Sequence, residues 1–293
     1  MSNISFDLSG KIDQQTVTTL STVKKVADAL HIPFFIVGAS ARDFILKHCY
    51  GIESRRMTMD VDLGVEVESW EQFNILTESL LSTPKISSVT KPQKFRCDSN
   101  FFDIIPFGKI TDKNRRISWP PEHGIFMNML GFKEAYENSI TVRLSSSPEL
   151  DIKLPTLPGL VLMKIISWKE KFPERKKDAE DLLLIMQKYE RAGNLDRLYD
   201  KEQELLKEEK FDVINAGIRL LGRDMAKIAD PNTLRAVRKI LDGETWERSQ
   251  FKLVTDMITG TPTLLDKFDD ILFQVKKLRQ GLVEASKNQC QTQ

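Results

Sequence analysis

The chain has 293 residues, of which 41% are hydrophobic and 29% are charged. This composition excludes an intrinsically disordered or fibrous protein, and the length is sufficient for one large hydrophobic core or two smaller ones. The 43 Lys and Arg residues and the 42 Asp and Glu residues give a formal net charge of +1. Because the molecule has no strong overall field, an anionic partner has to be met by a local basic patch.

Cysteine and histidine are too few and too scattered for a zinc site or a disulfide framework. The three cysteines lie far apart, and none of the three histidines has the HExxH spacing. We therefore expect any bound metal to be held by carboxylates. No apolar run approaches the roughly 20 residues that span a bilayer, and the first residues lack a signal-peptide pattern. We expect a cytoplasmic protein that does not interact with a membrane.

The first half of the sequence predicts helices and strands in alternation. Apolar residues at helical spacing predict helices, and short apolar or alternating runs predict strands. The helical segments are 17–30, 41–47 and 70–81. The strand segments are 34–37, 61–67, 95–98 and 101–105, with Pro106 and Gly108 expected to end the last one.

The second half predicts two short strands followed by helices almost to the end. The strands are expected over 141–144 and 150–153, and strongly periodic helices over 160–168 and 179–189. The charge run 201–210 is typical of a solvated helix face. We therefore predict an α/β (α+β) protein with a mixed-sheet domain over 1–155 and an all-helical domain over 156–293.

Asp60 and Asp62 are the strongest candidates for chemistry in the sequence. Side chains alternate with period two along a strand, so both carboxylates would lie on one face, close enough to share divalent cations. Two like charges on one face repel, and Mg²⁺ or Mn²⁺ would remove that cost because these ions prefer oxygen ligands. The alternative is that one of the two acids lies at a strand end and meets water.

Gly38, Ala39 and Ser40 form a turn of small residues between a predicted strand and a predicted helix. Backbone N–H groups at such a turn can hold a polyphosphate, and the Ser40 hydroxyl would add a further ligand. We include Arg42, in the helix that follows, and Thr58, shortly before the Asp pair, among the nucleotide-binding candidates. The alternative is an ordinary helix entry with Ser40 as the N-cap.

Asp103 is a single carboxylate within the apolar strand 101–105. An acid in such a strand has to be used or paired, because burying an unpaired charge is costly. The alternative is an edge-strand residue that faces solvent.

The turn, the Asp60-x-Asp62 strand and Asp103 together resemble the pattern of the nucleotidyltransferase superfamily typified by DNA polymerase beta. The resemblance covers roughly residues 33–186, and Gly-Ala-Ser is a variant of the family's usual turn. It implies a mixed-sheet nucleotidyltransferase domain and two-metal phosphoryl transfer with Mg²⁺ or Mn²⁺. By this resemblance Asp60 and Asp62 would bridge the metal ions, and Asp103 would serve the attacking hydroxyl. Ser40 and the turn amides would hold the β- and γ-phosphates of an NTP.

A second pattern lies in the helical half, where Lys164 interrupts an apolar helix and Asp178 and Asp181 follow the basic cluster Arg175-Lys176-Lys177. This pattern looks like that of the abortive-infection (AbiEii/AbiGii) type of nucleotidyltransferase toxin. The resemblance implies that Lys164 contacts the nucleotide phosphates from the helical domain and that Asp178, with Asp181 beside it, is functionally important. The alternative is a lysine whose stem lies along apolar surface and an ordinary acid at a helix start.

The function that these patterns imply is transfer of a nucleoside monophosphate from an NTP to a hydroxyl, with release of pyrophosphate. By resemblance to the toxin group, the acceptor would be the tRNA 3′ end, the protein would be the toxin of a type IV toxin–antitoxin system, and an antitoxin protein would be its partner. Phosphate contacts to RNA are expected from basic residues near the motifs: Arg55, Arg56, Arg175, Lys176 and Lys177.

Two alternatives remain open at this point. The enzyme could transfer the nucleotide to a protein or a small hydroxylated molecule. The chain could also be a catalytically idle member that only binds nucleotide or a partner. Three metal-facing carboxylates argue against the idle member, because a binding module does not need them. The segment from Lys113 to Trp119 mixes basic and aromatic residues, which fits either a nucleic-acid surface or a polar hairpin with a buried Trp.

Overall fold

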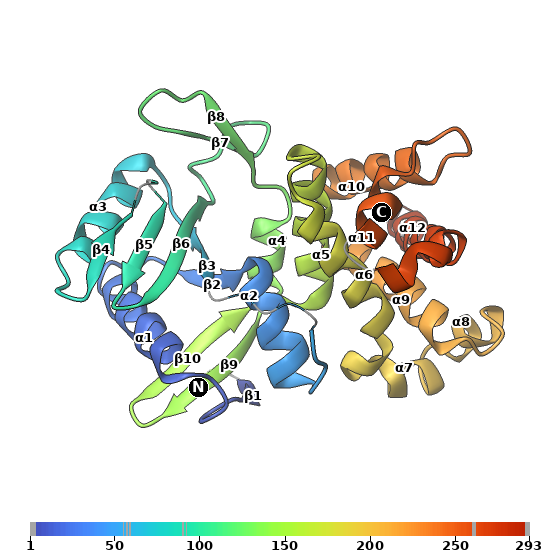
Figure 1. The fold of residues 1–293 in the computed structure, drawn as a ribbon, viewed down its shortest axis with the longest axis horizontal. Helices are drawn as coiled ribbons and strands as arrows, with labels where there is room; N and C mark the ends of the chain where they lie inside the picture. The colour runs from blue at the N-terminus through green and yellow to red at the C-terminus, as the bar shows by residue number, and fades with distance from the viewer. Residues whose placement is uncertain are drawn as a thin grey trace. The chain divides into compact units, whose positions relative to one another are not determined.

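The computed structural model describes residues 4–54, 56, 58, 60–89, 91, 93–259 and 262–290. The chain divides into two compact units, residues 1–156 and 157–293, shown in Figure 1. None of the helices in these described ranges has the length and apolar composition that a membrane crossing requires.

The first unit is built around a five-stranded mixed sheet with the strand order β2-β3-β6-β5-β4. β3 and β6 are parallel, whereas the other neighbouring strands are antiparallel. The strands are β2 (Phe34–Val37), β3 (Val61–Glu66), β4 (Ile86–Ser88), β5 (Lys94–Cys97) and β6 (Asn100–Phe107). The mixed sheet predicted from the sequence is confirmed.

Two helices pack beside this sheet, and each has a side-chain N-cap. α1 (Gln14–Ala29) begins after Asp13, whose carboxylate accepts a hydrogen bond from the Thr16 amide. α3 (Trp70–Leu81) begins after Ser69, whose hydroxyl accepts from the Gln72 amide. Such caps are worth about 1 kcal/mol each because they satisfy amides that have no partner inside the helix.

Smaller elements complete the first unit (Figure 1). A second sheet has the order β1-β9-β10, and β7 and β8 form a separate hairpin. The bounds are β1 (Ile4–Asp7), α2 (Gly38–Asp43), a π-helix (Phe44–Cys49), β7 (Arg116–Trp119), β8 (Ile125–Asn128), α4 (Phe132–Glu137), β9 (Ile140–Ser146) and β10 (Glu149–Leu154).

The core of the first unit is aromatic and aliphatic. Phe35 of β2 meets Phe107 of β6 edge to face, with ring centroids 5.6 Å apart. Leu63 and Ile104, on β3 and β6, are fully buried. Each such side chain contributes about 1.5 to 3 kcal/mol by leaving water. The central strands that carry the candidate carboxylates are therefore held rigidly by the packing around them.

The second unit is helical throughout its described residues, as the periodicity predicts. Its helices are α5 (Leu157–Glu170), α6 (Lys176–Lys188), α7 (Leu195–Tyr199), α8 (Gln203–Glu208), α9 (Val213–Ile228), α10 (Pro231–Thr245), α11 (Lys252–Thr259) and α12 (Phe268–Cys290), with a π-turn (Glu190–Asn194) and a 3₁₀ turn (Pro262–Lys267).

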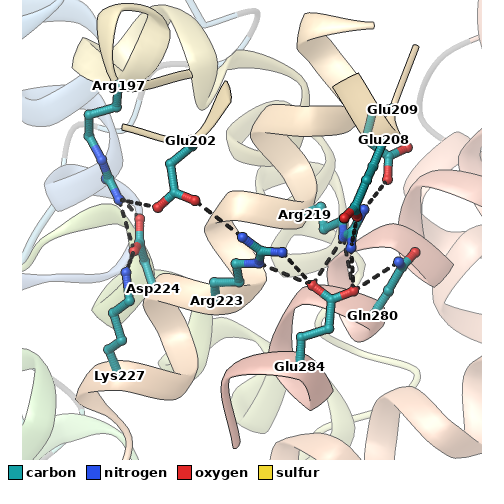
Figure 2. A network of polar contacts seen from close by, with 10 residues as sticks. All are labelled: Arg197, Glu202, Glu208, Glu209, Arg219, Arg223, Asp224, Lys227, Gln280 and Glu284. Atoms are coloured by element: carbon teal, nitrogen blue, oxygen red, sulfur yellow. Dashed lines mark hydrogen bonds and ion pairs between the residues drawn. The ribbon is translucent and has the colours of Figure 1, made fainter. Parts of the chain in front are cut away.

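α9 and α12 form the tightest helix pair of this unit. A Cβ on Gly281 would lie 1.9 Å from the Arg219 carbonyl oxygen, so the backbones approach too closely for any other residue there. The same pair is joined by charge (Figure 2), because Glu284 of α12 accepts hydrogen bonds from Arg219 and Arg223 of α9. Arg219 is buried and also binds Glu209 at 2.8 Å. The members of this network all belong to the helical unit, and their charges pair with one another across its helices.

Three details differ from the sequence predictions. Asp60 lies in a bend just before β3 and not in the strand. α2 already begins at Gly38, and its N-cap is Val37 and not Ser40. β6 runs through Pro106 to Phe107. Pro106 is tolerated because β5 begins opposite Asp103, so the missing N–H lies beyond the paired part of that edge.

Candidate functional site

Strand register places three charged side chains in one row across the central sheet. Asp62 of β3 lies opposite Val37 of β2 on one side and opposite Asp103 of β6 on the other. Lys94 of β5 lies opposite Asp103. Directly opposed residues on neighbouring strands carry their side chains on the same face. Asp62, Asp103 and Lys94 therefore share one face, beside the point where β2 ends in the Gly38 turn.

Asp60 joins this row through Lys94. The Lys94 ammonium donates a hydrogen bond of 2.5 Å to Asp60 Oδ2 and lies 3.8 Å from Asp103 Oδ1. The hydrogen bond to Asp60 raises the pKa of Lys94, so the ammonium stays charged. One cation thus serves two carboxylates and reduces their mutual repulsion. Sequence reasoning missed Lys94, because only the register of β5 against β6 brings it to the acids.

Asp103 is the least satisfied of the acids. Burial raises its pKa, and the opposing charge of Lys94 does not fully cancel that effect. Its Oδ1 is buried without a hydrogen-bond partner, since 3.8 Å to Lys94 is an ion-pair distance and too long for a hydrogen bond. A buried polar atom without a partner costs free energy and calls for a ligand or an ion.

The turn at Gly38 is fitted closely to Asp62. Gly38 has φ +68°, and a Cβ there would lie 2.1 Å from Asp62 Oδ2, so only glycine suits the position. Ser40 is buried, its hydroxyl donates to the Val37 carbonyl at 3.0 Å, and it accepts from the Asp62 amide at 3.3 Å. Ser40 therefore ties the turn to β3. Ala39 lies between them in the first turn of α2.

Arg42 and Thr58 meet at a different acid, Asp43. The Arg42 guanidinium is 1% exposed and donates to Asp43 Oδ1 at 2.9 and 2.6 Å, and to the Arg56 carbonyl at 2.7 Å. The Thr58 amide donates to Asp43 Oδ2 at 3.2 Å. These contacts link α2 to the segment before β3. In this structure Arg42 and Thr58 therefore hold that segment in position. The neighbouring candidate Arg55 lies outside the described residues.

The donor set suits a hard divalent cation, although the side chains are not arranged around one. In the described part of the chain, no three Asp, Glu, His or Cys side chains surround a common point. The ammonium of Lys94 instead lies against Asp60 and near Asp103. Carboxylates are the ligands that Mg²⁺ and Mn²⁺ prefer, and the unpartnered Asp103 Oδ1 offers one more. The three carboxylates of Asp60, Asp62 and Asp103 are therefore of the right chemical type to bind a divalent metal ion. The ammonium of Lys94 shows where a positive charge is favoured beside them.

The candidates in the helical unit form a separate, closed cluster. Lys164 of α5 donates to Asp178 Oδ1 at 3.1 Å and to Asp181 Oδ2 at 2.7 Å, both on α6. Ser167 donates to the second oxygen of Asp178 at 2.9 Å. Burial lowers the pKa of Lys164, but the two carboxylates outweigh that effect and hold the pKa above its ordinary value.

Because the Lys164 side chain is only 4% exposed, its charge is used within the helical unit. The structure therefore brings together Lys164, Asp178 and Asp181, as the motif suggests, in a link between α5 and α6. Contact of Lys164 with nucleotide phosphates stays a prediction.

Comparison with known proteins finds likeness only among solved structures. No family model matches the chain, and no curated protein matches it. The chain is similar to an antigenic nucleotidyltransferase-like protein from Paracoccidioides brasiliensis, at 18% identity and TM-score 0.37, over 71% of this chain and 94% of that one.

Two further likenesses concern enzymes. The antibiotic-resistance factor ANT(2'')-Ia is matched at 14% identity and TM-score 0.34, over 68% of this chain and 98% of that one. A CCA-adding enzyme in complex with ATP is matched at 15% identity and TM-score 0.33, over 94% of this chain and 69% of that one. These three solved proteins are nucleotidyltransferases or resemble them.

Proposed function

We propose that the protein is a Mg²⁺- or Mn²⁺-dependent nucleotidyltransferase that moves a nucleoside monophosphate from an NTP to a hydroxyl. The observation that supports this most directly is the row of Asp62 and Asp103 on neighbouring parallel strands, with Asp60 alongside and one Asp103 oxygen unpartnered. A structural role gives little reason for two carboxylates on one face of the sheet with a third beside them, because a single lysine only partly offsets their mutual repulsion.

The residues divide the chemistry among them. Bound divalent ions would supply charge stabilisation for the phosphates and a lower pKa for the acceptor hydroxyl. Asp60, Asp62 and Asp103 would hold these ions, and the close fit of the Gly38 turn keeps Asp62 in place. The acceptor oxygen forms a bond to the α-phosphorus while the bond to the bridging oxygen breaks and pyrophosphate leaves. The hydroxyl proton passes to a nearby carboxylate, and Asp103 is the acid that the resemblance assigns to the acceptor side.

RNA is the acceptor class that we propose, and several exposed basic and aromatic side chains of the helical unit support it. Lys252 Nζ lies 4.9 Å from the centre of the Phe172 ring, so the segment after α5 meets the start of α11. Trp246 is 60% exposed, and the Arg248 guanidinium lies 5.9 Å from its ring. The basic cluster 175–177, at the start of α6, is exposed. Exposed aromatic rings among cations are typical of surfaces that bind single-stranded RNA.

The finer parts of the proposal come from the resemblance in motif. They are the tRNA 3′ end as the acceptor site, a toxin role in a type IV toxin–antitoxin system, and a partner antitoxin. Within the same proposal, Lys164 and Asp178 contact the nucleotide, or they fix α5 and α6 so that other residues of these helices contact it. Transfer to a protein or a small molecule is the second candidate, and the site geometry suits it equally because the carboxylates do not select the acceptor.

The experiment is to incubate the purified protein with each α-labelled NTP, Mg²⁺ and total cell RNA, and to follow where the label goes. We expect label on RNA with the wild type. Asp60→Asn and Asp62→Asn should lower transfer at least about a hundredfold, since a lost metal ligand costs several kcal/mol in the transition state. Asp98→Asn is the matched control, because Asp98 is an exposed acid in the turn between β5 and β6.

Each outcome decides a different part of the proposal. Label on protein or a small molecule would overturn the RNA acceptor and leave nucleotidyl transfer standing. If folded protein transferred no label from any of the NTPs, the chain would be a catalytically idle member that only binds nucleotide or a partner. Wild-type transfer by Asp62→Asn would remove the metal-ligand role of that residue.

A further inference from the structure

We propose that Lys94 is a resident counter-cation of the carboxylate row, and that a divalent metal ion binds by displacing its ammonium from Asp60. The inference rests on the proposed metal-dependent function, and it adds a residue that competes with the metal. Lys94 is then a positioning residue that keeps the acids together before the metal arrives.

The first support is the position of the ammonium. Lys94 Nζ is 2.5 Å from Asp60 Oδ2, a short charged hydrogen bond, and 3.8 Å from Asp103 Oδ1. The strand register directs it there, because Lys94 lies opposite Asp103, which in turn lies opposite Asp62. The lysine is therefore built into the row by the sheet and is not a surface chain that happens to reach it.

The second support is that one ammonium does not satisfy this cluster. Lys94 makes one good hydrogen bond to Asp60, and Asp103 Oδ1 is left buried without a hydrogen-bond partner. Mg²⁺ takes six oxygen ligands at about 2.0 to 2.1 Å and carries twice the charge, so it can draw in oxygens that the ammonium leaves apart. The row is arranged for more positive charge than Lys94 supplies.

The third support is that the two cations exclude each other. A metal bound to Asp60 Oδ2 would lie within a few ångströms of the ammonium, and two cations at that distance repel strongly. Lys94 is able to leave, because its side chain is 26% exposed and its four-carbon stem rotates freely. The ring of Phe101 already lies 5.3 Å from Nζ, so the ammonium can keep this contact when it leaves Asp60.

Lys91 supplies a matched control for charge alone. It lies three residues before Lys94, is exposed, and acts on the Asp103 carboxyl through its charge. Lys91→Gln and Lys94→Gln remove the same charge from the same segment. A difference between the two variants therefore reports the contact with Asp60 and not the general field.

The first measurement is Mn²⁺ affinity, by electron paramagnetic resonance of free Mn²⁺, for the wild type and both variants. Lys94→Gln should bind Mn²⁺ about tenfold more tightly than the wild type, the size expected when a charged hydrogen bond no longer has to be broken. Lys91→Gln should change the affinity by about twofold or less, because exposed charges are screened. Equal affinities of the two variants would overturn the displacement.

The second measurement uses the wild type alone, so it does not depend on how a variant folds. Lysines are acetylated briefly with an N-hydroxysuccinimide ester, with and without Mn²⁺, and each site is quantified by peptide mass spectrometry. Acetylation of Lys94 should rise severalfold when Mn²⁺ is present, and that of Lys91 should stay constant. A Lys94 rate that is unchanged or lower at saturating Mn²⁺ would contradict the proposal.

The two proposals fail in different ways. If Mn²⁺ binds the wild type without any change at Lys94, the resident cation is wrong and the metal-dependent function stands. If neither the wild type nor Lys94→Gln binds Mn²⁺, both proposals are wrong. If only Lys94→Gln binds it, the competition is supported in its strongest form.

Discussion

Each unit of the protein contains a lysine set among aspartates, and the two clusters are built differently. In the helical unit, Lys164 is 4% exposed and hydrogen-bonds to Asp178 and Asp181 at 3.1 and 2.7 Å. In the sheet unit, Lys94 is 26% exposed and binds Asp60 closely, with Asp103 left at 3.8 Å.

The difference separates a finished ion-pair cluster from an open one. Around Lys164, two acids share one buried cation, and Ser167 donates a further hydrogen bond to Asp178. Around Lys94, Asp103 is left with a buried oxygen that has no hydrogen-bond partner. A completed buried cluster is costly to break, whereas an open one gains from a further cation. The same residue types therefore point to stability in one unit and to binding in the other.

The largest expected effect is from removing the enclosed lysine. Lys164→Met should lower the free energy of unfolding by about 3 to 5 kcal/mol, because it leaves two buried carboxylates without their cation. Lys94→Met should change it by about 1 kcal/mol or less, because that pair is partly exposed. Urea denaturation of both variants measures the contrast. A Lys164→Met variant with wild-type stability and lost NTP use would instead support the nucleotide role of Lys164.

Neutralising an acid should have opposite effects in the two clusters. Asp181→Asn should lower the free energy of unfolding by about 1.5 to 3 kcal/mol, because it weakens a buried charged hydrogen bond. Asp103→Asn should leave it unchanged or raise it, because burial already disfavours the charge of that carboxyl. Metal-free thermal and urea unfolding test both variants. Destabilisation by Asp103→Asn equal to that of Asp181→Asn would mean that the two clusters do not differ as described.

The turn beside the open cluster can be tested with a matched pair of glycines. Gly38→Ala should cost about 1 to 2 kcal/mol, because its φ of +68° is left-handed, and it should also displace the Asp62 carboxylate. Gly51 has φ +66° and open space around a Cβ, so Gly51→Ala carries the strain without the clash. Nucleotidyl transfer should fall only in Gly38→Ala. Equal loss in both variants would show that strain, and not the fit to Asp62, controls activity.

The smallest expected effect is a difference in pH dependence between Asp103 and Asp224. Burial raises the pKa of Asp224, but hydrogen bonds from Arg197, Lys227 and Tyr189 outweigh it and leave the pKa below the ordinary 3.8. The stabilisation that Asp224 provides is therefore fully present above pH 3.8 and is lost as the pH falls through the lower pKa of the folded state. The pKa of Asp103 is raised, so its cost to stability is relieved as the pH falls towards 3.8.

Denaturation curves at several pH values between about 7 and about 3 measure this difference, because carboxyl groups titrate within this range. As the pH falls, the difference in unfolding free energy between the wild type and Asp103→Asn should shrink before pH 3.8 is reached. The difference between the wild type and Asp224→Asn should shrink only below pH 3.8. If the order were reversed, the assignment of the paired and the unpaired acid would be wrong.

Much of the secondary structure follows from local sequence patterns. The strand 34–37 and the helix 70–81 have the same bounds in the structure as in the sequence prediction, because continuous burial and a capped amphipathic pattern are local signals. The strands β1 and β4 are absent from the sequence prediction, because short strands carry too few residues for a clear period. The segment from Lys113 to Trp119 enters the β7–β8 hairpin with Trp119 buried, which is the polar-hairpin alternative.

The candidate site is predictable from the sequence only in its acids. Asp60 and Asp62 follow from their spacing, and Asp103 from being a single charge in an apolar strand. Ser40 is expected from the sequence to offer its hydroxyl to a phosphate, and the structure shows it hydrogen-bonded to Val37 and Asp62. The difference arises because the partner atoms come from the preceding strand and from β3, which a local pattern does not reveal.

The charged residues and most helices and strands can be recognised from the amino-acid sequence, because both depend on residue type and near-neighbour spacing. The contacts of these residues appear only in the folded chain: Asp62 faces Asp103, Lys94 binds Asp60, and two acids enclose Lys164. These contacts depend on strand register and helix packing between residues 14 to 41 positions apart in the chain. Register is set by the burial of whole strands and helices, so no single motif contains it.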